Sequence, residues 1–347
     1  MTFSIVIPAH NGEAFIRHAL NSTILQTRRA DEIIVIDDAS KDKTSDIVNS
    51  PDIRGQLKYQ YNEITTGFVD AWNRAIERAS SDFVTILHQD DLLHPEYLAN
   101  IEKAIVRFPA VKHFYAACNY IDTDGNIIKS PPEPHSLEPI LYRGREYAHN
   151  YLMGVMSNQH VHRCPGVTTS RELLLNQCTY RKEAGHIADD DFFLRVGAFT
   201  DVVGISQPLA SYRHHSGSET ERLDLLSLKL AEAYLFQVRY YKDGSFLLES
   251  DDIEKINEQA IRFINLLLFQ GVLYKRDDWI QRSRELRDEF ERIKPGFMEK
   301  KLPHWAKRLW SLKQDPGSGH LPASLYVQAL HAMRQIRDFG RSFLKRR

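Results

Sequence analysis

Two pairs of adjacent acidic residues are the side chains in this sequence best suited to chemistry. Asp37 and Asp38 directly follow one hydrophobic segment, and Asp90 and Asp91 closely follow another. Burying adjacent carboxylates is costly unless hydrogen bonds or a cation compensate their charge. Carboxylate oxygens at Asp90 and Asp91 suit a hard divalent cation. The first pair suits the N–H groups of a nucleobase or the hydroxyls of a ribose, or else the cap of a helix starting near Asp42.

Short segments rich in β-branched residues must position these carboxylates. We expect three buried strands, at Phe3–Ile7, Glu32–Ile36 and Asp82–Leu87. Apolar residues recur at helical spacing over residues 15–23, 69–79 and 97–108. This alternation predicts an α/β fold with a mostly parallel sheet flanked by helices. Ligands of such sheets bind beyond the carboxyl ends of the strands, where both acidic pairs lie.

The composition excludes several classes of protein. The 347 residues include 45 Lys and Arg against 46 Asp and Glu, which argues against a globally basic nucleic-acid binder. Three cysteines without a CxxC pair argue against a disulfide framework or a cysteine-rich zinc site. The longest apolar run, Phe263–Phe269, is too short to span a bilayer, and no signal sequence precedes the first strand. We therefore expect a cytoplasmic protein that does not bind nucleic acid.

A series of motifs at these strand ends resembles the family 2 glycosyltransferases, which have the GT-A fold. The series comprises PAHN at Pro8–Asn11, VIDDASKDKT at Val35–Thr44, Gly67, Asn73, and LHQDDLLHPEYL at Leu87–Leu98. Two later motifs continue it, ADDDFFLRVG at Ala188–Gly197 and YRHHSGS at Tyr212–Ser218. Each motif alone is weak, but their order at successive strand ends is specific. The resemblance implies a Rossmann-like GT-A sheet, and the helical pattern after Glu219 indicates an α-helical C-terminal region.

The resemblance also implies a nucleotide-sugar donor, by default a UDP-sugar, at this edge of the sheet. The residues it assigns to the donor are Pro8, Ala9, Asn11, Asp37, Asp38, Gly67, Asn73, Asp90 and Arg213, with Asp38 the first choice for the base. It implies Mn²⁺ or Mg²⁺ bridging the donor diphosphate, with Asp91, Asp90 and His215 as ligands. The commonest form of the family has Asp two residues before Asp90, where this chain has His88. Whether His88 replaces a metal contact or a ribose contact stays open.

The motif ADDDFFLRVG supplies the expected catalytic base. In the family's acidic motif a carboxylate lies six residues before an Arg, and counting back from Arg195 reaches Asp189. An inverting transfer needs one base beside the acceptor hydroxyl, which we assign to Asp189. Asp190 is the rival, because Ala188 stands where the family often has Glu. Acidic residues also favour the first turn of a helix without any catalytic role, which suits Asp191.

We therefore expect a metal-dependent inverting glycosyltransferase acting on a hydroxyl of a glycan or lipid-linked saccharide, in bacterial surface polysaccharide synthesis. One alternative is a nucleotidyltransferase. Such enzymes generally carry a Gly-rich, basic loop after the first strand, whereas PAHNGEAF has one Gly and no Lys. A second alternative is a non-catalytic protein that binds sugar nucleotides, which the departure at His88 favours.

We expect two domains. Residues 1–218 form the catalytic domain, with the nucleotide-sugar half at about 1–118 and the acceptor half at about 119–218. We expect irregular loops and short strands over the site at Asn119–Pro165, where prolines are frequent and periodicity is weak. Residues 219–347 form a helical C-terminal domain.

The end of the chain is basic. Residues 298–347 contain eleven Lys and Arg against three Asp and Glu, a formal charge of +8. The terminal helical pattern has one apolar and one basic face, which favours peripheral contact with the inner membrane face, near a lipid-linked acceptor. A helix packed on protein with its basic face in water fits equally well. The run Phe263–Phe269 indicates burial between helices, or a contact in a homodimer.

Overall fold

The computed structural model describes residues 1–132, 137–157, 162–215, 217, 223–241, 248–303, 306–307 and 310. The chain divides into two units, which are described separately. The first comprises residues 1–182 and 188–218, and the second comprises residues 183–187 and 219–347.

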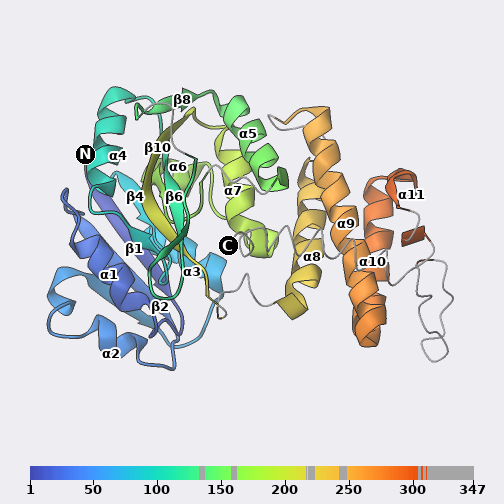
Figure 1. The fold of residues 1–347 in the computed structure, drawn as a ribbon, viewed down its shortest axis with the longest axis horizontal. Helices are drawn as coiled ribbons and strands as arrows, with labels where there is room; N and C mark the ends of the chain where they lie inside the picture. Colours follow the sequence, from blue (N-terminus) through green and yellow to red (C-terminus); the bar gives the residue numbers. More distant parts are fainter. Residues whose placement is uncertain are drawn as a thin grey trace. The chain divides into compact units, whose positions relative to one another are not determined.

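The β-branched segments form the parallel part of one large sheet in the first unit (Figure 1). Its strands are β1 Phe3–Ala9, β2 Glu32–Asp38, β3 Lys58–Asn62 and β4 Phe83–Ile86. Strand β1 pairs with β2 and β4, and β2 pairs with β3, all in parallel. Strand β3, with the sequence KYQYN, lacks an apolar run and is not among the expected strands. It forms one edge of the sheet, where a polar strand is tolerated.

Helices follow these strands where apolar residues recur at helical spacing. They are α1 Ile16–Ile24, α2 Thr44–Val48, α3 Phe68–Arg78 and α4 Tyr97–Arg107. In α1, the residues at the expected spacing, Ile16, Ala19, Leu20 and Thr23, are all buried. Gly67 precedes α3 with φ 86°, a conformation that favours glycine. The expected strand and helix pattern of this region is confirmed.

The sheet continues beyond β4 with strands of both directions. They are β5 Leu92–Leu93, β6 His113–Ile121, β7 Ile127–Lys129, β8 Ile140–Tyr142, β9 Val167–Ser170 and β10 Val202–Arg213. Along the sheet the order is β3-β2-β1-β4-β9-β6-β10-β5. Strand β9 runs antiparallel between β4 and β6, while β6 and β10 are parallel to each other. The sheet is therefore parallel through its first four strands and mixed beyond them.

The first unit also contains the helices α5, α6 and α7. Helix α5 spans Gly144–Ser157, inside the region where we expected irregular loops. Helix α7 spans Ala188–Val196 and carries all three acidic residues of ADDDFFLRVG in its first turn. A short helix, α6, spans Arg171–Asn176. The packing of α5 beside α7 (Figure 1) places α5 next to the acidic motif.

The second unit is helical. Its helices are α8 Leu223–Tyr241, α9 Ser250–Tyr274, α10 Asp277–Ile293 and α11 Phe297–Lys301, together with the 3-10 turn at Lys182–Ile187, most of which belongs to this unit. The apolar run Phe263–Phe269 lies in α9, and its hydrophobic side chains are buried. Phe263 stacks on Tyr234 of α8 at 5.3 Å between ring centroids, and Phe269 packs near Trp310. The run is thus buried between helices of the same chain.

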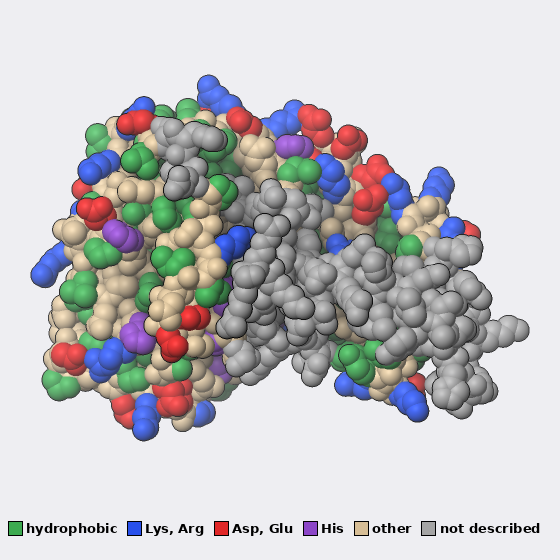
Figure 2. All heavy atoms as spheres, viewed as in Figure 1, with side chains coloured by type: hydrophobic (Ala, Val, Ile, Leu, Met, Phe, Trp, Pro, Cys, Tyr) green, Lys and Arg blue, Asp and Glu red, His purple; other side chains and the backbone are tan. Residues whose placement is uncertain are grey.

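The basic terminal helix expected after residue 322 lies outside the described residues. Across the part of the chain that is described, no helix combines the length and the hydropathy needed to cross a bilayer. On the face drawn in Figure 2, Lys and Arg side chains are interspersed with Asp and Glu side chains among the described residues.

Candidate active site at the sheet edge

The loops after β1, β2 and β4 are tied together by hydrogen bonds. Nδ1 of His10 lies 2.7 Å from the carbonyl oxygen of Asp38, and the His10 backbone bonds in both directions with the Gln89 side chain. Asn11 accepts the N–H of Lys41 and donates its own N–H to Ser40, each at 2.8 Å. These bonds fix the three strand ends as one surface.

Two residues of this surface adopt an unusual backbone conformation. Asn11 has φ 50° and Ala39 has φ 63°. Positive φ is uncommon for residues other than glycine, and such strain is concentrated at functional sites. Both residues lie in the loops that directly follow β1 and β2, where the donor is expected.

Both carboxylates of the first acidic pair organise the surrounding backbone. Asp38 accepts hydrogen bonds from Asn62, Thr65, Thr66 and Gly67 at 2.7–3.1 Å. Burial opposes its ionisation, but the bonds from Thr65, Asn62 and Thr66 lower the pKa of Asp38. Asp37 accepts the N–H of Ser40 and the hydroxyl of Tyr59, at 2.9 and 2.8 Å. Asp38 therefore shapes the turn that leads into α3, and its contact with a nucleobase stays a prediction.

The other residues assigned to the donor lie around this surface. Pro8 and Ala9 are in β1, paired with Ile36 and Asp37 of β2. Asn73, on α3, donates to the carbonyl oxygen of Tyr180 at 2.8 Å and accepts its N–H at 3.3 Å. Asn73 thus attaches α3 to the segment that leads to the acidic motif.

Three residues that follow β4 form a group of side chains that could bind a cation. One ligand-type atom each from His88, Asp90 and Asp91 lies within 4.8 Å of the others. Asp91 is 1% exposed, and its Oδ1 accepts the N–H of Arg213 at 2.9 Å. Its Oδ2 has no hydrogen-bond partner among the described residues and lies 3.7 Å from Nδ1 of His88. Burial, followed by the charge of Asp90, raises the pKa of Asp91 well above its ordinary value.

This arrangement fits a divalent cation. Oδ2 of Asp91 is buried, has no hydrogen-bond partner among the described residues and lies next to a second carboxylate, so the nearby arginines offset only part of the cost of its negative charge. A cation bound there supplies the missing charge, and carboxylate and imidazole groups are both established metal ligands. The donor set after β4 is therefore chemically suited to the implied Mn²⁺ or Mg²⁺.

Two residues at the end of β10 and just after it, Arg213 and His215, contact Asp90. Nε2 of His215 lies 2.9 Å from Oδ2 of Asp90. Burial opposes the ionisation of Asp90, but the hydrogen bond from His215 and the charges of His88 and His215 lower the pKa of Asp90. Arg213 donates from Nε to the Asp90 carbonyl oxygen and from Nη1 to the carbonyl oxygen of Asp122. Both predicted residues of YRHHSGS thus contact the acidic loop, and Arg213 holds its backbone.

The three carboxylates in the first turn of α7 have different environments. Asp191 is fully buried and accepts hydrogen bonds from Arg181 and Arg195 at 2.8–2.9 Å. Asp190 accepts the hydroxyl hydrogen of Tyr151 at 2.7 Å. Asp189 accepts the backbone N–H of Asp190 with Oδ1, at 2.9 Å. Asp191 is therefore bound by two arginine side chains and Asp190 by a tyrosine side chain. Among the described residues, no other side chain donates a hydrogen bond to Asp189.

The environment of Asp189 suits proton transfer near neutral pH. Burial first, and then the adjacent charge of Asp190, raise the pKa of Asp189 to about 7. The positive charge of Arg163 acts in the opposite direction and favours the ionised form. A carboxyl group with a raised pKa accepts a proton more readily than an ordinary aspartate does.

Arg163 is a site residue that the sequence analysis missed. Its Nε donates to the hydroxyl of Tyr120 at 2.9 Å, and its guanidinium lies 5.7 Å and 5.5 Å from the ring centroids of Tyr120 and Tyr212. Its charge lowers the pKa values of Asp91 and Asp189, opposing the effect of burial on each. The charge of one guanidinium therefore acts on both the cation-site carboxylate and the candidate base.

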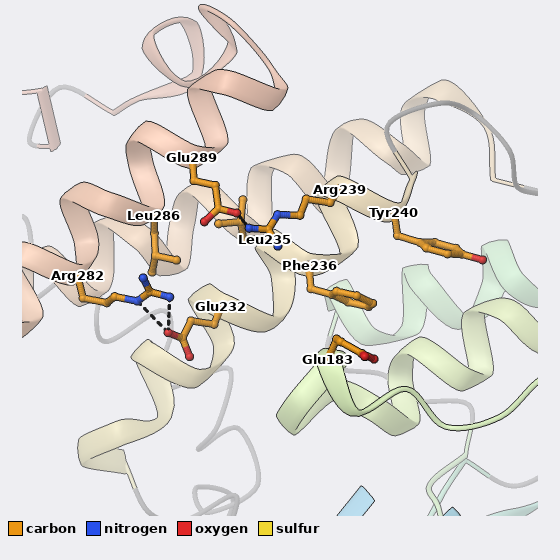
Figure 3. A pocket seen from close by; sticks show the side chains of 9 residues that line it. All are labelled: Glu183, Glu232, Leu235, Phe236, Arg239, Tyr240, Arg282, Leu286 and Glu289. Carbon is orange, nitrogen blue, oxygen red and sulfur yellow. Dashed lines mark hydrogen bonds and ion pairs between the residues drawn. The ribbon is translucent and has the colours of Figure 1, made fainter. Parts of the chain in front are cut away.

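The helical unit contains a separate cavity of about 510 Å³. Figure 3 shows residues of the facing helices α8 and α10 along its wall, where Arg282 pairs with Glu232 and Arg239 pairs with Glu289. The remaining lining residues are Glu183, Leu235, Phe236, Tyr240 and Leu286. The charged groups drawn on the two facing helices are paired with each other, and none of the candidate catalytic or cation-binding residues lines the cavity. The candidate active site is therefore the sheet edge of the first unit.

Comparisons with known sequences find glycosyltransferases. The sequence model of the family described as Glycosyl transferase family 2 matches residues 4–155. The protein named putative glycosyltransferase EpsH, of Bacillus subtilis (strain 168), is 26% identical over 278 residues, covering 76% of this chain and 74% of EpsH. The amylovoran biosynthesis glycosyltransferase AmsB of Erwinia amylovora is 27% identical over 285 residues, covering 72% of this chain and 88% of AmsB.

Solved structures share the fold. The crystal structure of S. aureus TarS 1–349 in complex with UDP-GlcNAc has a TM-score of 0.60 at 16% identity, covering 96% of this chain and 92% of that chain. The complex of the same protein with UDP has a TM-score of 0.59. The expected GT-A fold with a helical C-terminal region is confirmed, as is the expectation of a sugar-transferring enzyme. Residues 4–155 thus match a family 2 glycosyltransferase domain, and the curated relatives that extend over about three quarters of the chain are named as glycosyltransferases.

Proposed function

We propose that this protein transfers a sugar, with inversion, from a UDP-sugar to a hydroxyl of a glycan or lipid-linked saccharide. The observation that supports this most directly is the position of Arg163, whose charge acts on both Asp91 and Asp189. An inverting transfer needs a cation that stabilises the leaving diphosphate and a base on the opposite side of the anomeric carbon, and Asp91 and Asp189 are candidates for these two roles. TarS, which shares the fold, binds UDP and UDP-GlcNAc, which supports a uridine nucleotide as donor.

Donor binding involves the loops after β1, β2 and β4. Asp90 and Asp91 would hold Mn²⁺ or Mg²⁺, with His215 orienting Asp90 through its contact with Oδ2. The loops at Asn11 and Asp38, which hydrogen bonds join, would hold the base and ribose. When bound, a divalent cation supplies positive charge that stabilises the diphosphate as negative charge builds on it. Arg213 keeps the acidic loop in place through its bonds to backbone carbonyl oxygens.

Asp189 carries out the proton transfer. The acceptor oxygen forms a bond to the anomeric carbon while the bond from that carbon to the diphosphate oxygen breaks. The nucleoside diphosphate leaves with the bonding electron pair, and the carboxylate of Asp189 takes the hydroxyl proton. A single displacement inverts the configuration at the anomeric carbon. Tyr151 holds Asp190 away from this role, and Arg163 favours the ionised form of Asp189.

The regions of the chain divide this work. Residues 1–118 would bind the donor, residues 119–218 the acceptor, and residues 219–347 would form the accessory helical domain. The name of AmsB, with its reference to amylovoran biosynthesis, supports a role in making a bacterial polysaccharide. The basic segment at 298–347 would attach the enzyme to the inner membrane face, where lipid-linked acceptors are presented.

A donor screen tests the proposal. Thermal unfolding of the full chain is measured with a panel of sugar nucleotides, with and without Mn²⁺. We expect one or more UDP-sugars to raise the melting temperature only when Mn²⁺ is present, because ligands of the native state stabilise it. A shift with no uridine nucleotide, or the same shift without a divalent cation, would argue against the donor class or the metal requirement, respectively.

A further inference from the structure

We propose that His88 provides a nitrogen ligand in the cation site with Asp90 and Asp91, and that this ligand makes the site favour Mn²⁺ and Co²⁺ over Mg²⁺. The proposal rests on the metal-dependent function proposed above. It extends that function to the choice of ion.

The positions of the ligand atoms are suited to one shared ion. Nδ1 of His88 lies 3.7 Å from Oδ2 of Asp91, which is too long for a hydrogen bond. Two atoms on opposite sides of one ion, each bound at about 2.1 Å, are about 4.2 Å apart. Since the three ligand-type atoms all lie within 4.8 Å of one another, small side-chain rotations bring them to a common ion.

Two buried polar atoms of this group lack hydrogen-bond partners among the described residues. Neither Oδ2 of Asp91 nor Nε2 of His88 has a hydrogen-bond partner among the described residues, although both atoms are buried. Buried polar atoms in proteins are nearly always paired, so an unpaired carboxylate oxygen facing an imidazole indicates a missing component. An ion between Nδ1 and Oδ2 would pair this oxygen and neutralise the Asp91 charge.

Aromatic packing fixes the orientation of the imidazole. The ring of His88 stacks on Trp72 with centroids 5.1 Å apart and planes 22° apart. Trp72 is buried in α3 and packs edge-on against Tyr180 at 5.2 Å. Tyr180 is in turn bound through its backbone to Asn73, the next residue of α3. The stacking on Trp72 thus holds the ring of His88 in an orientation in which Nδ1 faces Asp91.

The second histidine of the site is engaged differently. His215 lies 2.9 Å from Oδ2 of Asp90 and packs its ring against Phe15, with centroids 4.7 Å apart. Its position orients Asp90, whereas His88 lies beside the unpaired oxygen of Asp91. Of the two histidines, His88 is therefore the one better placed to provide a nitrogen ligand to the cation.

A nitrogen ligand changes which ion binds best. Mg²⁺ prefers oxygen ligands in a near-octahedral arrangement, and it gives up bound water reluctantly. Imidazole suits transition metals, whose affinity for such sites increases from Mn²⁺ to Co²⁺. A site with one imidazole and two carboxylates therefore discriminates against Mg²⁺ more strongly than a site built from carboxylates alone.

Pulsed electron paramagnetic resonance of Mn²⁺ tests the ligand directly, without any measurement of activity. The full chain is mixed with Mn²⁺ and UDP, and the electron spin echo is examined for coupling to ¹⁴N. We expect ¹⁴N coupling in the natural protein and its loss in His88→Gln and His88→Asp. His94→Gln serves as the matched control, because His94 is an exposed histidine of the same region. Its coupling should be unchanged.

Calorimetry tests the choice of ion. With UDP present, we expect His88→Asp to weaken Co²⁺ binding by at least about tenfold and to reduce the preference for Mn²⁺ over Mg²⁺. His88→Gln shows whether loss of the nitrogen alone is sufficient, should the added charge of Asp unfold the site. Far-ultraviolet circular dichroism of each variant establishes that it is folded.

The outcomes separate this proposal from the proposed function. Mn²⁺ that binds and supports UDP binding, but shows no ¹⁴N coupling, overturns the role of His88 and leaves the proposed function intact. Coupling that persists in both His88 variants and disappears in His215→Gln assigns the nitrogen to His215 and likewise overturns it. A protein that binds no uridine nucleotide under any condition would instead contradict the proposed function.

Discussion

The hydroxyl of Tyr151 donates a 2.7 Å hydrogen bond to Oδ1 of Asp190, the residue directly after the candidate base. This contact comes from α5, a helix in a stretch where the sequence predicts irregular loops. It distinguishes two carboxylates that the sequence leaves as rivals. Asp190 is held by a neighbouring side chain, while Asp189 accepts only the backbone N–H of Asp190 among the hydrogen bonds found in the described residues.

Substitution at the two positions should therefore have unequal effects. Asp189→Asn removes the proton acceptor and should lower kcat by about 10²–10⁴-fold with little change in donor affinity. Asp190→Asn keeps an oxygen that accepts the Tyr151 hydroxyl, so its kcat should fall much less. Steady-state kinetics and calorimetry with the donor measure both quantities. Wild-type turnover in Asp189→Asn, with a large loss in Asp190→Asn, would transfer the base role to Asp190.

The pH dependence of turnover should report the raised pKa of Asp189. The base must be ionised to accept a proton, so activity should be present above about pH 7 and be lost as the pH falls through that value. Because Arg163 favours the ionised form of Asp189, Arg163→Met should move this loss of activity to higher pH. Profiles of kcat for both proteins check this. An acidic limb near pH 4 in the natural protein would show that no group with a raised pKa is required.

Donor binding should depend on Asp91 through the cation. Asp91→Ala should remove most of the gain in UDP affinity that Mn²⁺ provides, since it deletes the unpaired buried oxygen. Asp46→Asn is a matched control, because Asp46 is an exposed carboxylate on α2 in the same unit. Titration of UDP with and without Mn²⁺ measures the effect. The assignment fails if Asp91→Ala and Asp46→Asn respond to Mn²⁺ alike.

Asp191 should matter for stability more than for chemistry. It is fully buried between Arg181 and Arg195, so Asp191→Asn removes the charge that two guanidinium groups share. Breaking a buried ion pair by removing one partner costs about 3–5 kcal/mol, which should appear as a lower urea midpoint. Asp52→Asn breaks a surface pair with Arg17 and should leave the midpoint unchanged. Equal midpoints for the two variants would exclude a structural role for Asp191.

The sequence correctly predicts which candidate residues lie at strand ends. Local apolar patterns identify β1, β2 and β4, and the carboxyl ends of parallel strands meet at one edge. The acidic loop after β4 and the end of β10 come together as YRHHSGS suggests, through contacts of Arg213 and His215. The sequence can predict this grouping because the carboxyl ends of parallel strands lie at the same edge of the sheet.

The residues that the sequence does not predict depend on tertiary contacts. Tyr151 and Arg163 lie in or after α5, where no motif or periodicity marks them, and they reach the site through packing against α7 and two tyrosines. Asp38 shows a related limit. Its sequence context indicates a ligand contact, but only the fold reveals that its oxygens also hold the turn before α3. A pattern of residue types does not specify which acceptors the folded backbone occupies.

The most direct measurement is product analysis by nuclear magnetic resonance, with the full chain, Mn²⁺, a UDP-sugar found in the donor screen and a saccharide acceptor. The ³¹P spectrum identifies the released phosphates, and the ¹H coupling at the anomeric position gives the configuration of the glycoside. We expect free UDP to appear together with a glycoside of inverted anomeric configuration, and neither product to form at a comparable rate with Asp189→Asn. Release of pyrophosphate, or a product that retains the donor's anomeric configuration, would contradict inverting sugar transfer with Asp189 as the base.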